Sequence, residues 1–238
     1  MCACFSPDEK QIVAGTDDRN LYVVDAENGE VKIELSGHAG RIACVCYSPD
    51  GKLIVSGSLD QTVRIWDSQT GELLDTLTDF DNQVSSIAFR PDGKQMVTAS
   101  GNQHADFRAG NVKVWDVEKR KAVRRLNKQA EPFLAVAFSP DGSQILAAGG
   151  ERDTVQPSGD LKLWDAESGE LINSFKGHSN WISCVTFSPD GSRIASGAWD
   201  RTVRLWDVTS GSEIKSLTGS SGSVHCICLL YTSPSPRD

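Results

Sequence analysis

The sequence predicts an all-β fold that repeats one four-stranded unit along its 238 residues. Two observations support this prediction. Five Pro-Asp turns each precede a hydrophobic strand that ends in Asp, and 25 residues separate each strand-ending Asp from the next turn Asp. A fixed period of this size is the sequence signature of a repeat architecture. The turn aspartates are Asp8, Asp50, Asp92, Asp141 and Asp190, and the strand-ending aspartates are Asp25, Asp67, Asp116, Asp165 and Asp207.

The second unit illustrates the elements in order. Alternating apolar and small residues predict the first strand, and Pro followed by Asp-Gly predicts the tight turn after it. Further turn residues separate a second, a third and a fourth strand, so the unit reads as an antiparallel meander. The predicted order is strand Ile42–Tyr47, turn Ser48 to Gly51, strand Lys52–Ser58, turn Asp60-Gln61, strand Thr62–Asp67, turn Thr70-Gly71 and strand Glu72–Thr78.

One such meander cannot bury both of its faces, so we expect the units to stack radially as the blades of a β-propeller. We expect five blades and the start of a sixth, in an incomplete (open) ring that is a fragment of a larger propeller. The tail is expected to be non-native, since it loses the repeat pattern. The expected repeats are about 1–36, 37–78, 79–127, 128–176 and 177–218, followed by a partial unit at 219–227 and the tail at 228–238.

Short motifs at fixed places in the units identify the family that the chain resembles. The second unit combines Gly37-His38 with Ile65-Trp66-Asp67, and the fifth combines Gly177-His178 with Leu205-Trp206-Asp207. These residues resemble the WD-repeat (β-transducin repeat) family over about residues 1–227. The first unit departs from the pattern, because Val24 stands where the Trp is expected.

This resemblance implies a hydrogen-bonded network in two units, in which His, Ser, Asp and Trp side chains stiffen the blade. Ser58 is an alternative to Ser56 as the hydroxyl partner. We expect the third and fourth units to lack the network, because Phe80 and Gln129 replace the His. A Ser-His-Asp catalytic triad is disfavoured, since a triad also needs a cleft and an oxyanion site. The implied network residues are His38, Ser56, Asp60 and Trp66, and His178, Ser196, Asp200 and Trp206.

The first hypothesis about function rests on two insertions in the repeat pattern. Gly101–Gly110 and Gly150–Gly159 lengthen the hairpin between the second and third strands of adjacent units. Loops on a rigid scaffold are common binding elements, although simple surface decoration is an equal alternative because long loops cost little entropy. A metal site is disfavoured, since only two nearby ligands are visible. The candidate partner-binding residues in these loops are His104, Asp106, Phe107, Arg108, Glu151, Arg152 and Asp153.

Three further residues on the same face are candidate partner contacts, namely Arg41, Trp181 and Trp199. The repeat pattern does not require either Trp, and Trp and Arg are favoured interface anchors. The alternative is that each indole covers the edge of a neighbouring blade.

Net charge and cysteine content argue against several other kinds of function. A net charge of −8 argues against general nucleic-acid binding. The basic run at 119–128 is the exception, and it could touch acidic lipid, RNA or an acidic partner, or protect an exposed edge strand. Seven cysteines at repeat-equivalent positions predict buried thiols in a reducing compartment rather than metal ligands.

We therefore expect an intracellular protein–protein interaction scaffold, cytoplasmic or nuclear, that binds protein or peptide partners on its loop-bearing face. We expect no enzymatic activity, no cofactor, no metal, no membrane span and no small-molecule substrate. The alternatives are a propeller-based enzyme, and a phospholipid or nucleic-acid binder that uses the basic run.

Overall fold

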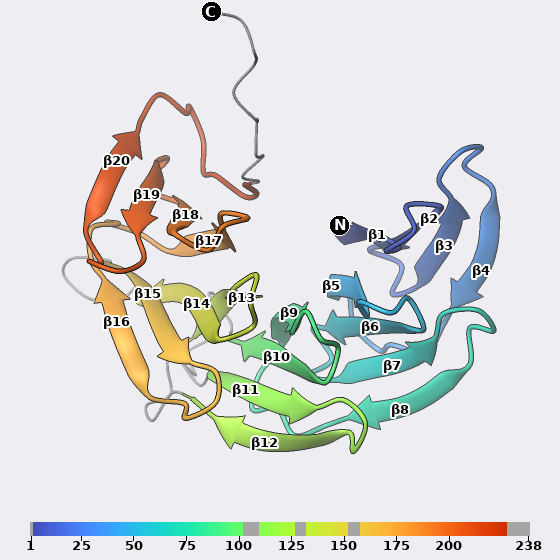
Figure 1. The fold of residues 1–238 in the computed structure, drawn as a ribbon. Coiled ribbons are helices and arrows are strands. Elements are labelled where there is room, and N and C mark those ends of the chain that lie inside the picture. The colour runs from blue at the N-terminus through green and yellow to red at the C-terminus, as the bar shows by residue number, and fades with distance from the viewer. Residues whose placement is uncertain (1, 102–109, 127–131, 152–157, 228–238) are drawn as a thin grey trace, which may run out of the picture. The chain divides into compact units, whose positions relative to one another are not determined.

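The computed structural model describes residues 2–101, 110–126, 132–151 and 158–227, and it describes Glu151 by its backbone alone. These residues form 20 strands and no helix, arranged in five antiparallel four-stranded sheets (Figure 1). In every sheet the four strands follow one another in sequence order. The chain divides into two compact units, Met1–Val136 and Ala137–Asp238, and each is considered by itself.

The first unit contains three complete sheets and the beginning of a fourth. Each turn and strand follows the predicted meander. The strands are β1 (Cys2–Phe5), β2 (Gln11–Gly15), β3 (Leu21–Asp25) and β4 (Val31–Leu35); β5 (Ile42–Tyr47), β6 (Leu53–Ser58), β7 (Val63–Asp67) and β8 (Leu73–Leu77); β9 (Val84–Phe89), β10 (Gln95–Ser100), β11 (Asn111–Asp116) and β12 (Lys121–Arg125).

Strand β13 (Phe133–Phe138) begins the fourth sheet and crosses the boundary at Val136. The second unit contains the rest of that sheet and the whole of the fifth. Its strands are β14 (Gln144–Glu151), β15 (Ser158–Asp165) and β16 (Leu171–Phe175), then β17 (Ile182–Phe187), β18 (Arg193–Ala198), β19 (Val203–Asp207) and β20 (Glu213–Leu217).

The repeated turn after each first strand is stabilised by its own side chains. Ser48 Oγ donates a hydrogen bond to Asp50 Oδ1 over 2.7 Å, and the backbone N–H of Lys52 donates to the same oxygen over 3.1 Å. Gly51 has a φ of 73°, a left-handed backbone conformation that is unfavourable for any residue with a Cβ. The local sequence therefore specifies this turn without help from the neighbouring sheet.

Adjacent sheets of the first unit share cores. Leu35 at the end of β4 is 1 % exposed and packs in one cluster with Ile42 and Trp66 of the next sheet. The close approach depends on a missing side chain, because a Cβ on Gly15 would lie 2.5 Å from Cγ2 of Ile42. The junction between the second and third sheets has the same construction, with Gly57 against Val84.

The second unit has one continuous core between its two sheets. Phe175 of β16 is 2 % exposed and packs with Ile182, Ile194 and Trp206 of the fifth sheet. Gly197 lies against Val224 as Gly57 lies against Val84, so the start of the sixth repeat already contacts the fifth sheet.

Five four-stranded antiparallel sheets, each with its strands in sequence order, are consistent with the blades of a WD-repeat propeller. The all-β repeat fold expected from the sequence is therefore confirmed. No described helix is long and apolar enough to span a membrane.

Candidate partner-binding site

The second sheet contains a chain of hydrogen bonds that leads from its core to the loop end. Trp66 Nε1 donates to Ser56 Oγ over 2.9 Å, and Ser56 Oγ lies 2.8 Å from His38 Nε2. His38 Nδ1 lies 2.8 Å from Asp60 Oδ2. The consistent proton arrangement has Ser56 donating to Nε2 and His38 Nδ1–H donating to Asp60. Every polar atom of the buried indole and imidazole thus has a partner.

The electrostatics of this network favour a neutral His and a charged Asp. Burial lowers the pKa of His38, and the nearby Asp60 only partly opposes that effect. Burial also raises the pKa of Asp60, but hydrogen bonds from Thr62, His38 and the Ala39 N–H outweigh it and bring the pKa to about 2. The network is therefore a structural anchor with a fixed protonation state near neutral pH.

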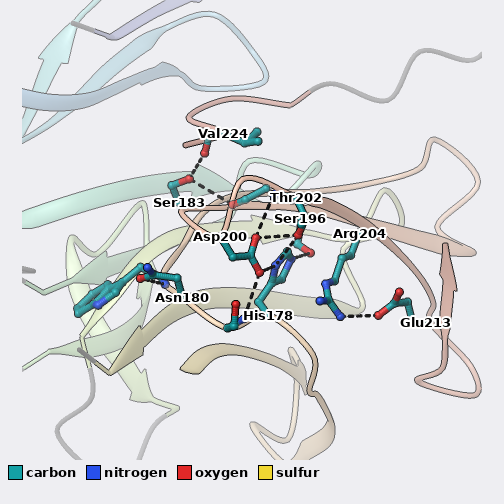
Figure 2. Close-up of polar contacts among 12 residues, drawn as sticks. His178, Asn180, Ser183, Ser196, Asp200, Thr202, Arg204, Glu213 and Val224 are labelled. Carbon is teal, nitrogen blue, oxygen red and sulfur yellow. Dashed lines mark hydrogen bonds and ion pairs between the residues drawn. The ribbon is translucent and has the colours of Figure 1, made fainter. Parts of the chain in front are cut away.

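The fifth sheet builds the same network, which Figure 2 shows around His178. His178 lies 2.8 Å from Ser196 Oγ and 2.7 Å from Asp200 Oδ2, and Trp206 Nε1 donates to Ser196 over 2.8 Å. Thr202 supports the carboxylate from the other side, with its hydroxyl 2.7 Å from Asp200 Oδ1. Burial lowers the pKa of His178 as well.

Ser58, the alternative hydroxyl partner, has another role. Its Oγ accepts a hydrogen bond from the backbone N–H of Asp60 over 3.1 Å. Ser56 and Ser58 both lie on β6, and neither is accessible to solvent. Ser56 therefore holds the indole, while Ser58 fixes the turn that carries Asp60.

The third sheet retains part of the network, contrary to the expectation that it would be lost. Trp115 Nε1 donates to Thr98 Oγ1 over 2.9 Å, so Thr98 takes the place of Ser56. Phe80 replaces the His and packs on the indole, with ring centroids 5.3 Å apart. The sequence signal was available, because Thr98 stands six residues after its turn Asp, as Ser56 does.

The residues around the network form the loop-bearing face of each sheet. In the second sheet the N–H of Leu59 donates to the carbonyl of Arg41 over 3.0 Å, so the two residues lie side by side. Leu59 is 38 % exposed, and the guanidinium of Arg41 lies 3.8 Å from the carboxylate of Asp17 in the first sheet. An exposed cation and an exposed aliphatic side chain thus share one rim.

The equivalent pair in the fifth sheet differs in exposure. The N–H of Trp199 donates to the carbonyl of Trp181 over 2.8 Å, and Trp199 is half-buried. Trp181 is only 2 % exposed, and its Nε1 has no hydrogen-bond partner. The burial of Trp181 favours the alternative that its indole covers the edge of a neighbouring blade over a direct partner contact.

The remaining predicted loop residues lie outside the described residues, and these are His104, Asp106, Phe107, Arg108, Arg152 and Asp153, together with the side chain of Glu151. Within the described ranges, no group of three or more His, Cys, Asp or Glu side chains could hold a metal ion.

Comparison with known proteins gives two matches. The family model described as IFT122 first beta-propeller matches residues 1–157. The model described as WD domain, G-beta repeat matches residues 169–207. No curated protein matches the chain. Propellers of this kind generally act as protein-interaction scaffolds and are typically not enzymes.

Proposed function

Because the chain belongs to the WD-repeat β-propeller family, with the IFT122 first beta-propeller model covering residues 1–157, we propose that it binds protein or peptide partners on its loop-bearing face. The observation that carries this proposal is the juxtaposition of Arg41 and Leu59 on one exposed rim. Arg is enriched among the residues that dominate binding energy at interfaces, and the exposed Leu59 adds apolar surface beside it.

The rim is well suited to binding because it is held rigidly. Asp60, which follows Leu59, is fixed by His38 and by the N–H of Ala39 over 2.9 Å. Binding then costs little ordering of the scaffold, which leaves more of the contact energy for affinity. The two inserted loops and Trp199 stay sequence-based predictions of partner contacts, each considered apart from this rim.

The test compares two variants that make the same charge change at opposite ends of one sheet. Arg41→Glu changes the rim, whereas Lys52→Glu changes the exposed turn before β6. Proteins captured from a cell extract by the wild-type chain should be lost, or weakened at least about tenfold, with Arg41→Glu and retained with Lys52→Glu. A third variant replaces both inserted loops by the short turn Leu59-Asp60-Gln61.

Identical sets of captured proteins for the wild type and both rim and loop variants would contradict the proposal. Loss of partners with Lys52→Glu alone would move the site to the opposite end of the sheets.

The proposal also includes the cellular compartment in which the protein works. The described cysteines are all free thiols, and burial raises the pKa of Cys184 to about 11. Unpaired, protonated thiols of this kind fit a reducing intracellular compartment. Non-enzymatic binding is likewise part of the proposal, in keeping with the family's usual role.

A further inference from the structure

Strand β12 is the outermost strand of the third sheet, whose order is β12-β11-β10-β9. Leu126 donates its N–H to the carbonyl of Val112 over 2.9 Å, and Arg125 stands opposite Lys113. Backbone groups alternate in direction along an antiparallel strand. The N–H and C=O of Arg125 therefore face away from β11, toward the free edge of the sheet.

In two other sheets, the outward backbone N–H at this register position donates to the side chain of the preceding residue. Thr76 of β8 stands opposite Arg64, and its N–H donates to Asp75 Oδ1 over 2.7 Å. Ser174 of β16 donates its N–H to Asn173 Oδ1 over 2.8 Å. In β12 the preceding residue is Arg124, whose side chain has donors only and cannot make this cap. The edge of β12 thus lacks a device that blocks the edges of β8 and β16.

The charge of β12 also differs from that of the other outer strands. Lys121 stands where the first, second and fourth sheets have a Glu, and β12 contains three cations and no acid. Lys121, Val123 and Arg125 are exposed, with Val123 at 50 %. The equivalent glutamates are Glu30, Glu72 and Glu170.

We propose that the edge of β12 binds an acidic, extended segment of another protein, which adds to the third sheet as a fifth strand. Strand addition draws its affinity from main-chain hydrogen bonds, here to the backbone of Arg125. The register shift between Val114 and Trp115 places Lys121 and Arg125 on opposite faces of the sheet. The incoming strand would therefore need acidic side chains on both faces, near Lys121 on one and near Arg125 on the other, with an apolar side chain beside Val123. In a chain of net charge −8, this strand has the charge complementary to such a partner.

The cations that precede β12 are already held by the protein, which favours a strand over a diffuse polyanion. Lys119 Nζ lies 3.0 Å from Asp116 Oδ2. Arg120 donates to the carbonyl of Leu74 over 2.7 Å and lies 3.9 Å from Asp75. Lys121 and Arg125 are by contrast exposed, so exposed positive charge lies along the open main-chain edge of this strand.

The experiment measures binding to the full chain of a labelled nonapeptide that repeats Glu-Glu-Val, which carries Glu on both faces of the strand it would form, with a Lys-Lys-Val peptide as the charge control. We expect the acidic peptide alone to bind. Arg125→Pro should weaken binding at least about tenfold, because Pro removes an outward N–H that the sheet does not use. Ser216→Pro in β20 is the matched control, since Ser216 stands opposite Arg204 at the same register position, and it should bind like the wild type.

Two further measurements separate strand addition from simple charge attraction. Lys121→Glu combined with Arg125→Glu keeps the N–H and should weaken binding at least about tenfold at low salt. Hydrogen exchange at the amide of Arg125 should slow when the acidic peptide is added. Arg41→Glu should leave this binding unchanged, so this inference can fail or succeed independently of the loop-face proposal.

Several results would overturn the inference. Equal binding by the wild type and Arg125→Pro would exclude strand addition. Binding of phosphatidylserine vesicles or single-stranded RNA without binding of the peptide would reassign the surface to lipid or nucleic acid. Aggregation of the charge-reversed variant, with no peptide binding by the wild type, would leave only edge protection as the role of the cations.

Discussion

A hydroxyl group beneath an indole is the contact that recurs in the second, third and fifth sheets. Ser56, Thr98 and Ser196 accept from Trp66, Trp115 and Trp206 over 2.8 to 2.9 Å. Among the described residues, His and Asp extend this contact to the loop end in the second and fifth sheets. The hydroxyl is therefore the part of the network that the core requires, because an indole N–H buried without a partner is costly.

Replacement of Ser56 by Ala tests that requirement. The change leaves the N–H of Trp66 and the Nε2 of His38 without their partner, so we expect a loss of about 2–3 kcal/mol of unfolding free energy. Ser58→Ala is the matched control, because Ser58 serves a single backbone N–H, and it should cost about 1 kcal/mol. Urea unfolding followed by Trp fluorescence gives both values. Equal losses would contradict the division of roles between the two serines.

The sequence was sufficient for the residues of the complete networks, because the family resemblance supplied their types and positions. It was insufficient for Trp181, since an indole beside a loop can lie over or under the surface, and packing decides between the two. It also missed Thr98, because the hydroxyl holds the indole N–H of Trp115 independently of the His, so Phe80 in place of the His does not remove that contact.

At the scale of the strand, turn chemistry made most bounds predictable. The predicted strand Ile42–Tyr47 agrees with β5, and the predicted Lys52–Ser58 differs from β6 by one residue at its start. Asp caps and left-handed glycines act over a few residues, so they leave a local trace in the sequence. The two inserted loops carry no such periodic signal, and their residues 102–109 and 152–157 lie outside the described ranges.

Arg120 is the exception among the turns before the outer strands. It adopts a φ of 54° where the other four sheets have Gly at 71° to 75°. Its contacts with Leu74 and Asp75 offset that strain. The glycines of the other sheets at this position are Gly29, Gly71, Gly169 and Gly211.

A pair of substitutions at Arg120 separates strain from contact. Arg120→Ala loses the contacts and keeps the unfavourable φ, whereas Arg120→Gly loses the contacts and removes the strain. The Gly variant should be more stable than the Ala variant by about 1 kcal/mol, and close to the wild type. Thermal and urea unfolding measure the difference. An Ala variant as stable as the Gly variant would show that the turn carries no strain.

At the scale of the whole molecule, each compact unit contains one complete His network, His38 in the first and His178 in the second. In both, burial holds the pKa of the folded His below its ordinary value. Both units should therefore respond to acid in the same pH window, although they have separate cores.

We expect the free energy of unfolding to fall as pH drops from about 7.5 to about 5.5, since unfolded His takes up a proton near pH 6.5. Because the folded pKa is lowered, the stabilisation is complete above the unfolded pKa and is lost as pH falls below it. A further loss should follow below about pH 4, where Asp60 must be protonated against a folded pKa of about 2.

The control for this pH dependence is the double variant His38→Phe with His178→Phe, which follows the packing of Phe80 on Trp115. Its unfolding free energy should change less between pH 7.5 and 5.5 than that of the wild type. Urea titrations at the two pH values measure both slopes. The same slope in both proteins would assign the acid response to other groups.

The survival of the Thr98 contact in the third sheet bears on how divergent blades can be detected. A search profile that weights the histidine would pass over a blade of this type, and so would one built on the Asp of the short turn. A profile that scores any hydroxyl six residues after the turn Asp, together with the strand-three indole, would recover it. Blade counts made from histidine-based patterns are therefore too low for any relative in which a blade has lost the His but kept the hydroxyl and the Trp.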